Sequence, residues 1–532
     1  MRNAHEVAKV RAAERSLMAG LPPGTLMQRA AAGLASVCAG LTGKVAGSHV
    51  VVLAGSGDNG GDALYAGARL ARRGAAVLAV TAGSKVHADG AAALRVAGGQ
   101  LAGPGDPAVP AAIGAADLIV DGLLGIGGKG GLREPQASLA ALAARSPAVV
   151  VAVDLPSGVD ADTGLVEGAA IQADVTVTFG TLKPGLLVDP GATHAGVVEL
   201  IDIGLGSYLD PPDASALQAT DLGVLLRRPP ADSDKYRRGV VGIVAGSQRF
   251  TGAAALAVGG AIRGGAGMVR LVSAEHAVAV VRVLWPEAVI TVTGQDQPPG
   301  DDVAAAGRVQ AWVAGPGMGT DDQARERLAA VLATDLPVLV DADGLTLLAA
   351  NRGLLDRSAP TLLTPHAGEL GRLLGADSAD VESRRLEHAR RAAAELGATV
   401  LLKGSTTVIA TADGYAGPGG GSGAAPVFVN PTGTSWLGTA GTGDVLSGLA
   451  GALLAQGLAV SQAAAAAAYL HGLAARLAAS GAGERPVPAT EPPAAGRRAE
   501  GSGDRHAEAP IAAADVIGAL PDAIRAVRQG AG

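Results

Sequence analysis

A chain of 532 residues is longer than one hydrophobic core usually organises, so we expect two domains of roughly 200 to 300 residues each. The composition, with 79 glycines, 2% aromatic and 17% charged residues, is typical of α/β layers and not of a disordered chain. The net charge of −7 comes without a cluster of Lys and Arg, so a nucleic-acid partner is excluded. A single cysteine, Cys38, excludes an internal disulfide framework and a cysteine-built zinc site.

The two segments that resemble targeting or membrane sequences are better explained otherwise. Residues 1–18 interleave charged and apolar side chains and lack the apolar stretch of a secretory signal peptide. Residues 458–479 are rich in alanine, but Gln462, His471 and Arg476 interrupt them, which favours a buried helix over a membrane span. We therefore expect a cytoplasmic protein without a membrane partner, and a homo-oligomer.

Short β-branched runs alternate with Ala- and Leu-rich stretches from residue 49 onward. The runs are HVVVLAG, AAVLAVTAG, ADLIVDGLLG, AVVVAVDLPSG, ADVTVTFG and GVVELIDIG. This alternation is typical of βαβ units and predicts a parallel sheet in an α/β fold. We place this first domain at residues 1–212.

The alternation fades between about Gly206 and Asp234, where Pro pairs and polar residues are typical of a connector, and we place a linker at residues 213–234. It resumes with GVVGIVAG, GMVRLV, VQAWVAGPG, LPVLVDAD, PTLLTPH and ATVLLKG, so a second α/β domain is expected over residues 235–532. Within it, residues 480–510 are polar and rich in Pro and Gly, which predicts a disordered loop.

A glycine-rich turn, GSGDNGGDA at Gly55 to Ala63, follows the first of these strands and precedes a predicted helix. Gly55, Gly57 and Gly60 have the spacing of a dinucleotide fingerprint, and amides at a helix start can hold an anion. The next predicted strand, VLAVTAG, lacks the acid with which a Rossmann dehydrogenase holds a ribose. Taken alone, the motif is weak, and a structural turn explains it equally well.

Acids and amides lie at three strand ends of the first half, the glycine-rich turn included. They are Asn59 and Asp62, Asp121 in VDGLLGIGGKGG, and Asp154 and Ser157 in VDLPSG. The carboxyl ends of parallel strands open onto one crevice, so these side chains should lie together. Each acid alone has a helix cap as its alternative, but three such turns on one edge favour a site.

The strings GSGDNGGDA, DGLLGIGGKGGLREP and DLPSGVDADTG together resemble, in order, the motifs of the NAD(P)H-hydrate epimerase family, the YjeF N-terminal type, across about residues 2–209. The resemblance implies a Rossmann-like three-layer αβα fold and a potassium ion bound by Asn59, Asp121 and Ser157, whose oxygens are suitable hard ligands. We expect Asp154 and Lys129 to handle protons. The hydrated nicotinamide would be held by Asp58, Asn59, Gly60, Gly61, Asp62, Gly125, Ile126, Gly127, Gly128, Lys129, Gly130, Gly131 and Asp154.

The second half contains GTAGTGDVLSGLAGALLAQG at residues 438–457, in which glycines lead into an apolar helix. The amides of Gly441, Thr442 and Gly443 would point at a developing negative charge, and the helix dipole would reinforce them. Asp444, beside these amides, is predicted to be a general base. For this string alone, an aspartate that caps a helix is the alternative.

Four other strings occur in the order of a ribokinase-like phosphoryl-transfer site: KYRRGVVGIVAGSQRFTGAAALA, GPGMGTD, LTPHAGEL and LLKGSTTVI. With the glycine loop they resemble the ADP/ATP-dependent NAD(P)H-hydrate dehydratase family, the YjeF C-terminal type, across about residues 222–529. The resemblance implies a ribokinase-like αβα domain. It assigns Ala253, Gly317, His366 and Asp444 to the hydrated cofactor, Lys403, Gly404, Ser405, Thr406 and Thr407 to ADP, Gly443 to the leaving AMP, and Glu369 to Mg²⁺ through water.

The function implied for the whole chain is repair of hydrated NADH and NADPH. One half would interconvert the R and S hydrates, and the other would dehydrate the S form at the expense of ADP, giving NAD(P)H, AMP and phosphate. Phosphorylation turns the C6 hydroxyl, a poor leaving group, into phosphate, a good one.

Two alternatives stay open at this point. One is a ribokinase-like small-molecule kinase fused to a non-catalytic nucleotide-binding domain, because the fold alone does not decide between a kinase and this dehydratase. The other makes the first half a partner-binding module without activity. Asp154 and Lys129 argue against the second, and the string TPHAGEL argues against the first.

Overall fold

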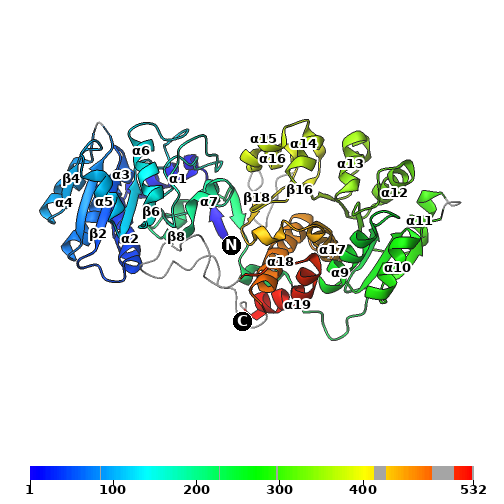
Figure 1. The fold of residues 1–532 in the computed structure, drawn as a ribbon. Coiled ribbons are helices and arrows are strands. Elements are labelled where there is room, and N and C mark those ends of the chain that lie inside the picture. Colours follow the sequence, from blue (N-terminus) through cyan, green and yellow to red (C-terminus); the bar gives the residue numbers. More distant parts are fainter. Residues whose placement is uncertain (84, 227, 295–297, 413–426, 482–507, 530–532) are drawn as a thin grey trace. The chain divides into compact units, whose positions relative to one another are not determined.

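The computed structural model describes residues 1–83, 85–226, 228–294, 298–412, 427–481 and 508–529 (Figure 1). The chain divides into two compact units between Ala214 and Ser215. We call residues 3–214 the N-terminal unit and the described residues from Ser215 onward the C-terminal unit. Each is described by itself.

The N-terminal unit is built on a parallel seven-stranded sheet in the order β4-β3-β2-β5-β6-β7-β8. The order reverses between β2 and β5, and ligands of open α/β sheets bind at such a point, beyond the carboxyl ends of the strands. The strands are β2 (His49–Ala54), β3 (Ala76–Thr81), β4 (Gln100–Ala102), β5 (Leu118–Gly122), β6 (Val149–Val153), β7 (Val175–Phe179) and β8 (Val197–Ile201).

Helices cover both faces of this sheet, because successive residues of each strand point to opposite sides. Val50 and Val52 of β2 belong to one hydrophobic core, and Val51 and Leu53 belong to the other. Burial of each such side chain contributes about 1.5–3 kcal/mol. The first core includes α1 (Val7–Met18), α2 (Thr25–Leu41), α3 (Asp58–Arg72) and α4 (Ala88–Val96), and the second includes α5 (Val109–Gly114) and α6 (Gln136–Arg145). A short helix, α7 (Gly191–Ala195), precedes β8.

The C-terminal unit is built on a larger, mostly parallel sheet in which β17 and β18 are antiparallel. Within the residues of this unit its order is β18-β17-β16-β15-β14-β13-β10-β11-β12. The strands are β10 (Val240–Val244), β11 (Met268–Ser273), β12 (Val289–Val292), β13 (Ala311–Ala314), β14 (Val338–Val340), β15 (Thr361–Leu363), β16 (Thr399–Leu402), β17 (Thr407–Ala410) and β18 (Val427–Asn430). Two short strands, β1 (Arg2–Ala4) and β9 (Ala214–Ala216), contain the points at which the chain passes from one unit to the other.

Two layers of helices enclose this sheet as well. Val241, Ile243 and Val313 pack with one layer, which includes α9 (Thr251–Arg263), α17 (Thr442–Ala455), α18 (Val460–Ser480) and α19 (Ala513–Gln529). In Figure 1 the helices α12 to α16 lie on the other side of the strands. The remaining helices are α8 (Ala219–Leu225), α10 (Glu275–Leu284), α11 (Pro299–Ala305), α12 (Asp322–Leu332), α13 (Asp343–Ala350), α14 (Ala367–Leu374), α15 (Ser378–Ser383) and α16 (Arg385–Leu396).

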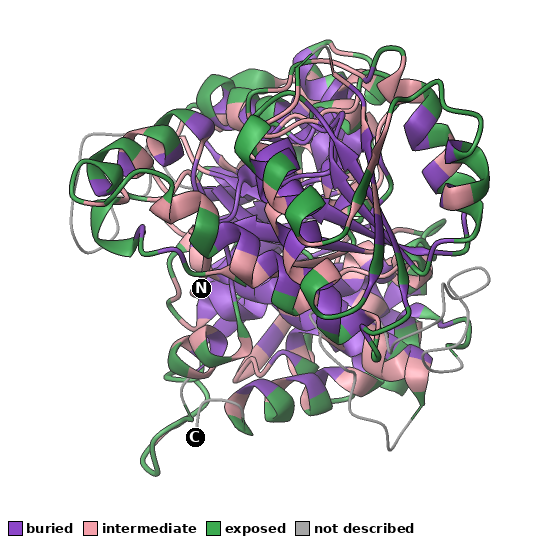
Figure 2. Ribbon diagram, turned by 90° about the vertical axis from the view of Figure 1, so that its left-hand side faces the viewer, coloured by how far each residue is buried: buried purple, intermediate pink, exposed green. Residues whose placement is uncertain are grey.

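The two αβα expectations are confirmed, and in Figure 2 the buried residues concentrate in the strands and on the inner sides of the helices. The Ala-rich segment at residues 458–479 is the buried helix α18, and no helix in the described ranges is long and apolar enough to cross a membrane. The loop expected at residues 480–510 falls mainly outside the described residues.

The segment expected to be a linker, residues 213–234, is not a plain connector. It contains strand β9 and helix α8. Gln218 and Asp221 form a capping box that starts α8, and Leu222 is fully buried in the core shared with α19. One Pro pair, Pro211-Pro212, precedes β9 and the other, Pro229-Pro230, follows α8, so the Pro pairs flank these two elements.

Candidate active sites

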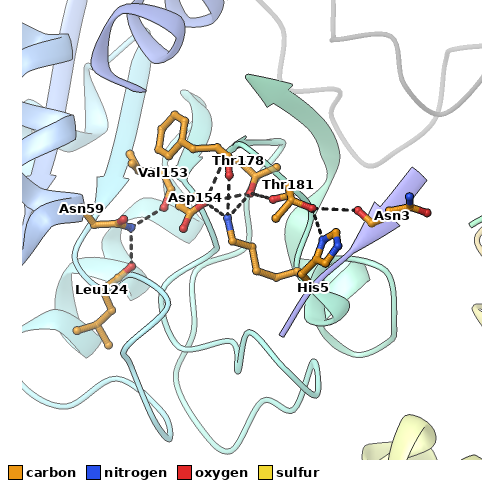
Figure 3. A network of polar contacts seen from close by, with 10 residues as sticks. Asn3, His5, Asn59, Leu124, Val153, Asp154, Thr178 and Thr181 are labelled. Carbon is orange, nitrogen blue, oxygen red and sulfur yellow. Dashed lines mark hydrogen bonds and ion pairs between the residues drawn. The ribbon is translucent and has the colours of Figure 1, made fainter. Parts of the chain in front are cut away.

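Asn59 ties together two loops at the carboxyl edge of the N-terminal sheet (Figure 3). It lies in the first turn of α3, directly after the glycine-rich turn. Its Nδ2 donates hydrogen bonds to the carbonyl oxygens of Leu124, at 2.9 Å, and Val153, at 2.6 Å. The loops that follow β5 and β6 are therefore held together by one amide.

Asp121 and Ser157 meet in the same place. Asp121, at the end of β5, is fully buried and accepts hydrogen bonds from Ser157 Oγ at 2.7 Å and Ser157 N at 2.9 Å. Ser157 Oγ also accepts a hydrogen bond from the amide of Leu124 at 2.8 Å. Burial raises the pKa of Asp121 to about 6, although the hydrogen bonds from Ser157 and Leu123 oppose the shift. All three residues expected to bind potassium thus contact one another or the backbone of Leu124.

The donor chemistry at this place fits an alkali cation. It consists of a carboxylate, a hydroxyl and two backbone carbonyls, all hard oxygen ligands. Within the described residues, no basic side chain pairs with Asp121 to balance its buried charge. A bound cation would supply that balance.

Asp154 forms the centre of a second network, one strand further along the sheet (Figure 3). It follows β6 with a φ of 64°, a left-handed conformation that is costly for a residue other than glycine. Its Oδ1 accepts hydrogen bonds from Thr178 Oγ1 at 2.9 Å and from the amide of Phe179 at 3.2 Å, and it forms an ion pair with Lys183. Lys183, which is 1% exposed, also donates to Thr178 Oγ1 at 3.0 Å.

The structure does not place Lys129 in contact with Asp154. Lys129 was expected to share proton handling with Asp154, but its side chain is 72% exposed and its Nζ pairs with Asp160 at 2.8 Å. The lysine that contacts Asp154 is Lys183, which sequence reasoning missed. Its signal was a single lysine in TLKPG, directly after the buried strand β7.

Further acids surround this network. Burial raises the pKa of Asp62 well above its usual range, and the charges of Asp154, Asp58 and Glu14 add to the shift. Asp62 Oδ1 is a buried oxygen without a hydrogen-bond partner among the described residues. Burial also raises the pKa of Glu14, a residue of α1 that the motifs did not mark, while the charge of Lys183 lowers it.

The expected glycines at this edge permit close approach of the backbone. A Cβ on Gly60 would lie 2.2 Å from the carbonyl oxygen of Gly55, and a Cβ on Gly125 would lie 2.8 Å from Asn59 Oδ1. Both positions therefore exclude any larger residue. Gly61, Ile126, Gly127, Gly128, Gly130 and Gly131 lie in the same two segments, the start of α3 and the loop after β5.

The glycine loop of the C-terminal unit ends at Gly441, which precedes α17 with a φ of 89°. Thr442, Gly443 and Asp444 form the first turn of α17, so their amides lie at the positive end of the helix dipole. The residue that caps this helix is Gly441 and not Asp444. The alternative in which Asp444 is only a helix cap therefore does not apply. Burial raises the pKa of Asp444 to about 7, with Asp341 adding to the shift and Lys403 opposing it.

Lys403 lies in an ion-pair network next to this turn. Its Nζ is 2.7 Å from Asp341 Oδ1 and 3.8 Å from Glu369 Oε2, and Ser447 Oγ donates to Asp341 Oδ2 at 2.7 Å. Burial alone would lower the pKa of Lys403, but the charges of Asp341 and Glu369 raise it. A Cβ on Gly443 would lie 3.5 Å from Lys403 Nζ, so these two expected nucleotide ligands adjoin each other.

Asp341 is the main residue that sequence reasoning missed in this unit. It directly follows the buried strand β14 in LPVLVDAD, a strand-end position like those that marked Asp121 and Asp154 in the first half. Its side chain is 2% exposed, and its carboxylate accepts hydrogen bonds from Lys403 Nζ and Ser447 Oγ.

His366 and Glu369 form a capping box at the start of α14. His366 Nδ1 accepts from the amide of Gly368 at 3.0 Å, and Glu369 Oε2 accepts from the amide of His366 at 2.8 Å. His366 is therefore a helix-start histidine in this structure, with a side chain that is 58% exposed. Glu369 belongs both to this cap and to the Lys403 network.

Two other expected residues lie side by side in the C-terminal unit. Gly317 has a φ of 58°, and a Cβ there would lie 2.8 Å from Ala253 Cβ in α9.

The remaining residues expected at the nucleotide continue the turn from Lys403 into β17. They are Ser405, Thr406 and Thr407, of which Thr406 and Thr407 are buried. Within the part of the chain that the structure describes, no hydrogen bond or ion pair joins Gly317 or His366 to Asp444.

Comparison with known proteins identifies both halves of the chain. Residues 23–185 match the family described as YjeF-related protein N-terminus, and residues 241–491 match the family described as NAD(P)H-hydrate dehydratase. Among solved structures, the ADP/ATP-dependent NAD(P)H-hydrate dehydratase from Bacillus subtilis, co-crystallized with ATP/Mg²⁺, is 26% identical, covers 59% of this chain and 99% of its own, and has a TM-score of 0.47.

Curated relatives match over both units. The bifunctional NAD(P)H-hydrate repair enzyme Nnr of Mycobacterium leprae is 47% identical, over 92% of this chain and 96% of its own length. The enzymes of the same description from Mycobacterium tuberculosis and Escherichia coli are 46% and 34% identical, over 87% and 83% of this chain and 92% and 83% of their own lengths. With these identities over nearly its whole length, the chain belongs to the family of bifunctional NAD(P)H-hydrate repair enzymes.

Proposed function

We propose that this protein restores hydrated NADH and NADPH to the reduced coenzymes. The N-terminal unit interconverts the R and S hydrates, and the C-terminal unit dehydrates the S form with ADP as phosphoryl donor. The observation that carries the proposal is the position of Asp444, whose pKa is raised to about 7, in the first turn of α17 next to the Lys403 network, in a chain of this family. The domains assigned to the two reactions are residues 1–212 and 235–532.

In the N-terminal unit, Asp154 is the base for epimerisation. Its carboxylate takes the proton of the C6 hydroxyl. The bond between C6 and the ring nitrogen breaks, so C6 becomes an aldehyde carbon, and the electron pair of that bond moves onto the conjugated nitrogen. Asp62, whose pKa is raised by burial and by neighbouring acids, returns a proton to that nitrogen. Closure on the other face of the aldehyde, with the proton transfers reversed, gives the other epimer.

Asn59, Asp121 and Ser157 would hold a potassium ion in this unit. The positive charge would balance the buried carboxylate of Asp121 and hold the loops after β5 and β6 in place. Asp58, Gly60, Gly61 and residues 125–131 then line the space for the hydrated nicotinamide. Lys129, exposed and paired with Asp160, is at most a contact to this substrate and not the proton carrier.

In the C-terminal unit, Asp444 takes the proton of the C6 hydroxyl of the hydrate. The hydroxyl oxygen then attacks the β-phosphorus of ADP. The bond to the bridging oxygen breaks and AMP leaves, near Gly443. The phosphorylated C6 oxygen then departs as phosphate while C5 loses a proton, which forms the C5–C6 double bond of NAD(P)H. Ala253, Gly317 and His366 would contact the hydrated cofactor.

The residues from Lys403 to Thr407 hold the nucleotide in this proposal, and amides at the start of α17 stabilise the transferring phosphoryl group. Magnesium ions in proteins usually keep several of their water ligands, and Glu369 beside Lys403 would hold the ion through such water. When bound, the ion would neutralise charge on the phosphates.

The test is an assay at the absorbance of NADH with separated R and S hydrates, magnesium, and either ADP or ATP. We expect the S hydrate to yield NADH, AMP and phosphate at once, and the R hydrate to follow at the rate of epimerisation. A stable phosphorylated product without NADH would identify a kinase instead.

Asp154→Ala tests the N-terminal unit. It should leave S-hydrate repair intact while the R hydrate accumulates, after subtraction of spontaneous epimerisation. Unchanged use of both epimers would make the N-terminal unit a non-catalytic module.

We also propose a cytoplasmic location and a homo-oligomeric state. The single, fully buried Cys38 supports a reducing compartment. Cell fractionation and sedimentation equilibrium test the two proposals separately.

A further inference from the structure

Arg385 lies behind the turn that joins β16 to β17. It begins α16 and is 1% exposed, although its side chain carries a permanent charge. Its Nη2 donates to the carbonyl oxygens of Lys403, at 2.8 Å, and Leu402, at 3.3 Å, and its Nε donates to that of Thr406, at 3.3 Å. Its Nη1 forms an ion pair with Glu382. One guanidinium therefore binds the backbone on both sides of the turn.

Gly404 is matched to this arginine. A Cβ at Gly404 would lie 2.1 Å from Arg385 Nη2 and 2.5 Å from Cζ, distances that no side chain reaches without displacing the guanidinium. Gly404 has no positive φ in this structure, so its small size and not its backbone conformation is what the site requires. The turn and the arginine thus form one packed unit.

The hydrogen bonds from Arg385 also set the direction in which the backbone N–H groups of the turn point. In a trans peptide plane the N–H points opposite to the carbonyl of the preceding residue. Because the carbonyls of Lys403 and Thr406 face Arg385, the amides of Gly404 and Thr407 face away from it. The guanidinium is a planar fork of fixed geometry, so a lysine cannot make the same set of hydrogen bonds.

We infer that Arg385 is a positioning residue for the nucleotide: it holds residues 403–407 in the conformation that binds the phosphates of ADP, and Gly404 is its necessary partner. The inference rests on the proposed nucleotide site at this turn. Arg385 is buried behind the turn and acts through its backbone. Loss of the guanidinium should therefore weaken nucleotide binding more than it slows the chemical step.

The chain offers a matched control in Arg357. This arginine also binds backbone oxygen, since its Nη2 donates to the carbonyl of Leu336 at 2.8 Å, and its Nη1 donates to Thr361 Oγ1 at 2.9 Å. These contacts lie before β14 and at the start of β15, at the amino ends of strands and not at the turn after β16. A general loss of stability should follow from either substitution, but a specific loss of ADP binding only from that of Arg385.

The experiment measures ADP binding to the full chain by calorimetry, with Arg385→Met, Arg385→Lys and Arg357→Met, each checked for folding by circular dichroism. We expect Kd for ADP to rise about 10- to 100-fold in Arg385→Met, to a lesser extent in Arg385→Lys, and to stay within about twofold in Arg357→Met. In the NADH assay, KM for ADP should rise with Kd while kcat changes less. Equal ADP affinity in folded Arg385→Met and wild type would overturn the inference.

Gly404→Ala provides a second route if Arg385→Met does not fold. Alone it should weaken ADP binding, because the new Cβ displaces the guanidinium. In the Arg385→Lys background its effect should be smaller than in the wild type, since the two positions are coupled. Additive effects would contradict the inference. Absence of ADP binding by the wild-type chain would instead refute the proposed function, so the two failures are distinguishable.

Discussion

Lys183 and Asp154 form an ion pair at the carboxyl edge of the N-terminal sheet, with the lysine side chain 1% and the aspartate side chain 10% exposed. Removal of one partner would leave the other charge buried without compensation, at a cost of about 3–5 kcal/mol. The pair also explains how Asp154 keeps a left-handed backbone conformation, because donors from Thr178, Phe179 and Lys183 meet at one of its oxygens.

We predict that Lys183→Met lowers the epimerisation rate about 10²–10⁴-fold, because the proposed base loses the partner that orients it. Lys183→Arg, which retains the charge, should retain more activity. Lys129→Met is the comparison at an exposed lysine and should have the smaller effect. The measurement is the interconversion of R and S hydrates by chromatography, with thermal unfolding as the control for folding. A larger loss in Lys129→Met than in Lys183→Met would restore the original assignment.

Asp444 should control the pH dependence of dehydration. A general base works in its ionised form, so the rate with ADP should rise with pH through about 7, the pKa to which burial raises this carboxyl. Asp444→Ala should lower kcat about 10²–10⁴-fold and remove this rise. Normal turnover in the variant would assign the base to another residue.

The raised pKa of Asp444 also predicts how the stability of the protein depends on pH. The pKa of Asp444 in the folded state, about 7, lies above its ordinary value of 3.8, so the folded chain binds the proton more tightly than the unfolded chain. The contribution of this group to stability is full below pH 3.8 and is lost as the pH rises through 7. Asp444→Asn should therefore stabilise the protein relative to wild type at pH 8 but not at pH 4. Melting temperatures at the two pH values measure this, and an equal difference at both would contradict it.

His471 should contribute to unfolding in mild acid. Burial lowers its pKa from 6.5 to about 4, and the charge of Lys403 adds to this effect. The unfolded chain then binds the proton more readily, so the contribution is present above pH 6.5 and is lost as the pH falls through 4. His471→Gln should flatten the fall in melting temperature between pH 6.5 and 4. An unchanged pH profile in a folded variant would show that His471 is not responsible.

Potassium should stabilise the N-terminal unit through Asp121. A ligand that binds only the folded state adds about 2.7 kcal/mol when its concentration is 100 times Kd. We expect a higher melting temperature in potassium chloride than in choline chloride at equal ionic strength, and no such difference in Asp121→Asn. The readout does not depend on activity. Equal melting temperatures of the wild type in both salts would count against the proposed site.

Much of this protein follows from local sequence. The alternation of β-branched runs with Ala- and Leu-rich stretches predicted the parallel sheet of the N-terminal unit and the α/β fold of the C-terminal unit, because side-chain period and chain connection are local properties. The strand-end residues Asn59, Asp121 and Ser157 were also predicted together, since all parallel strands bring their carboxyl ends to one edge. The motifs were sufficient to recognise the family before any geometry was known.

Other relationships depended on tertiary structure, because they join residues that no sequence spacing relates. Lys183 pairs with Asp154 across 29 positions and Lys403 pairs with Asp341 across 62, while Arg385 of α16 binds the turn between the strands β16 and β17. Lys129 stood inside a motif and still lies at the surface, whereas Lys183 stood outside every motif and is buried. Sequence determined which elements form and which edge carries the chemistry; only packing decided which charges meet, because burial and ion pairing arise between distant segments.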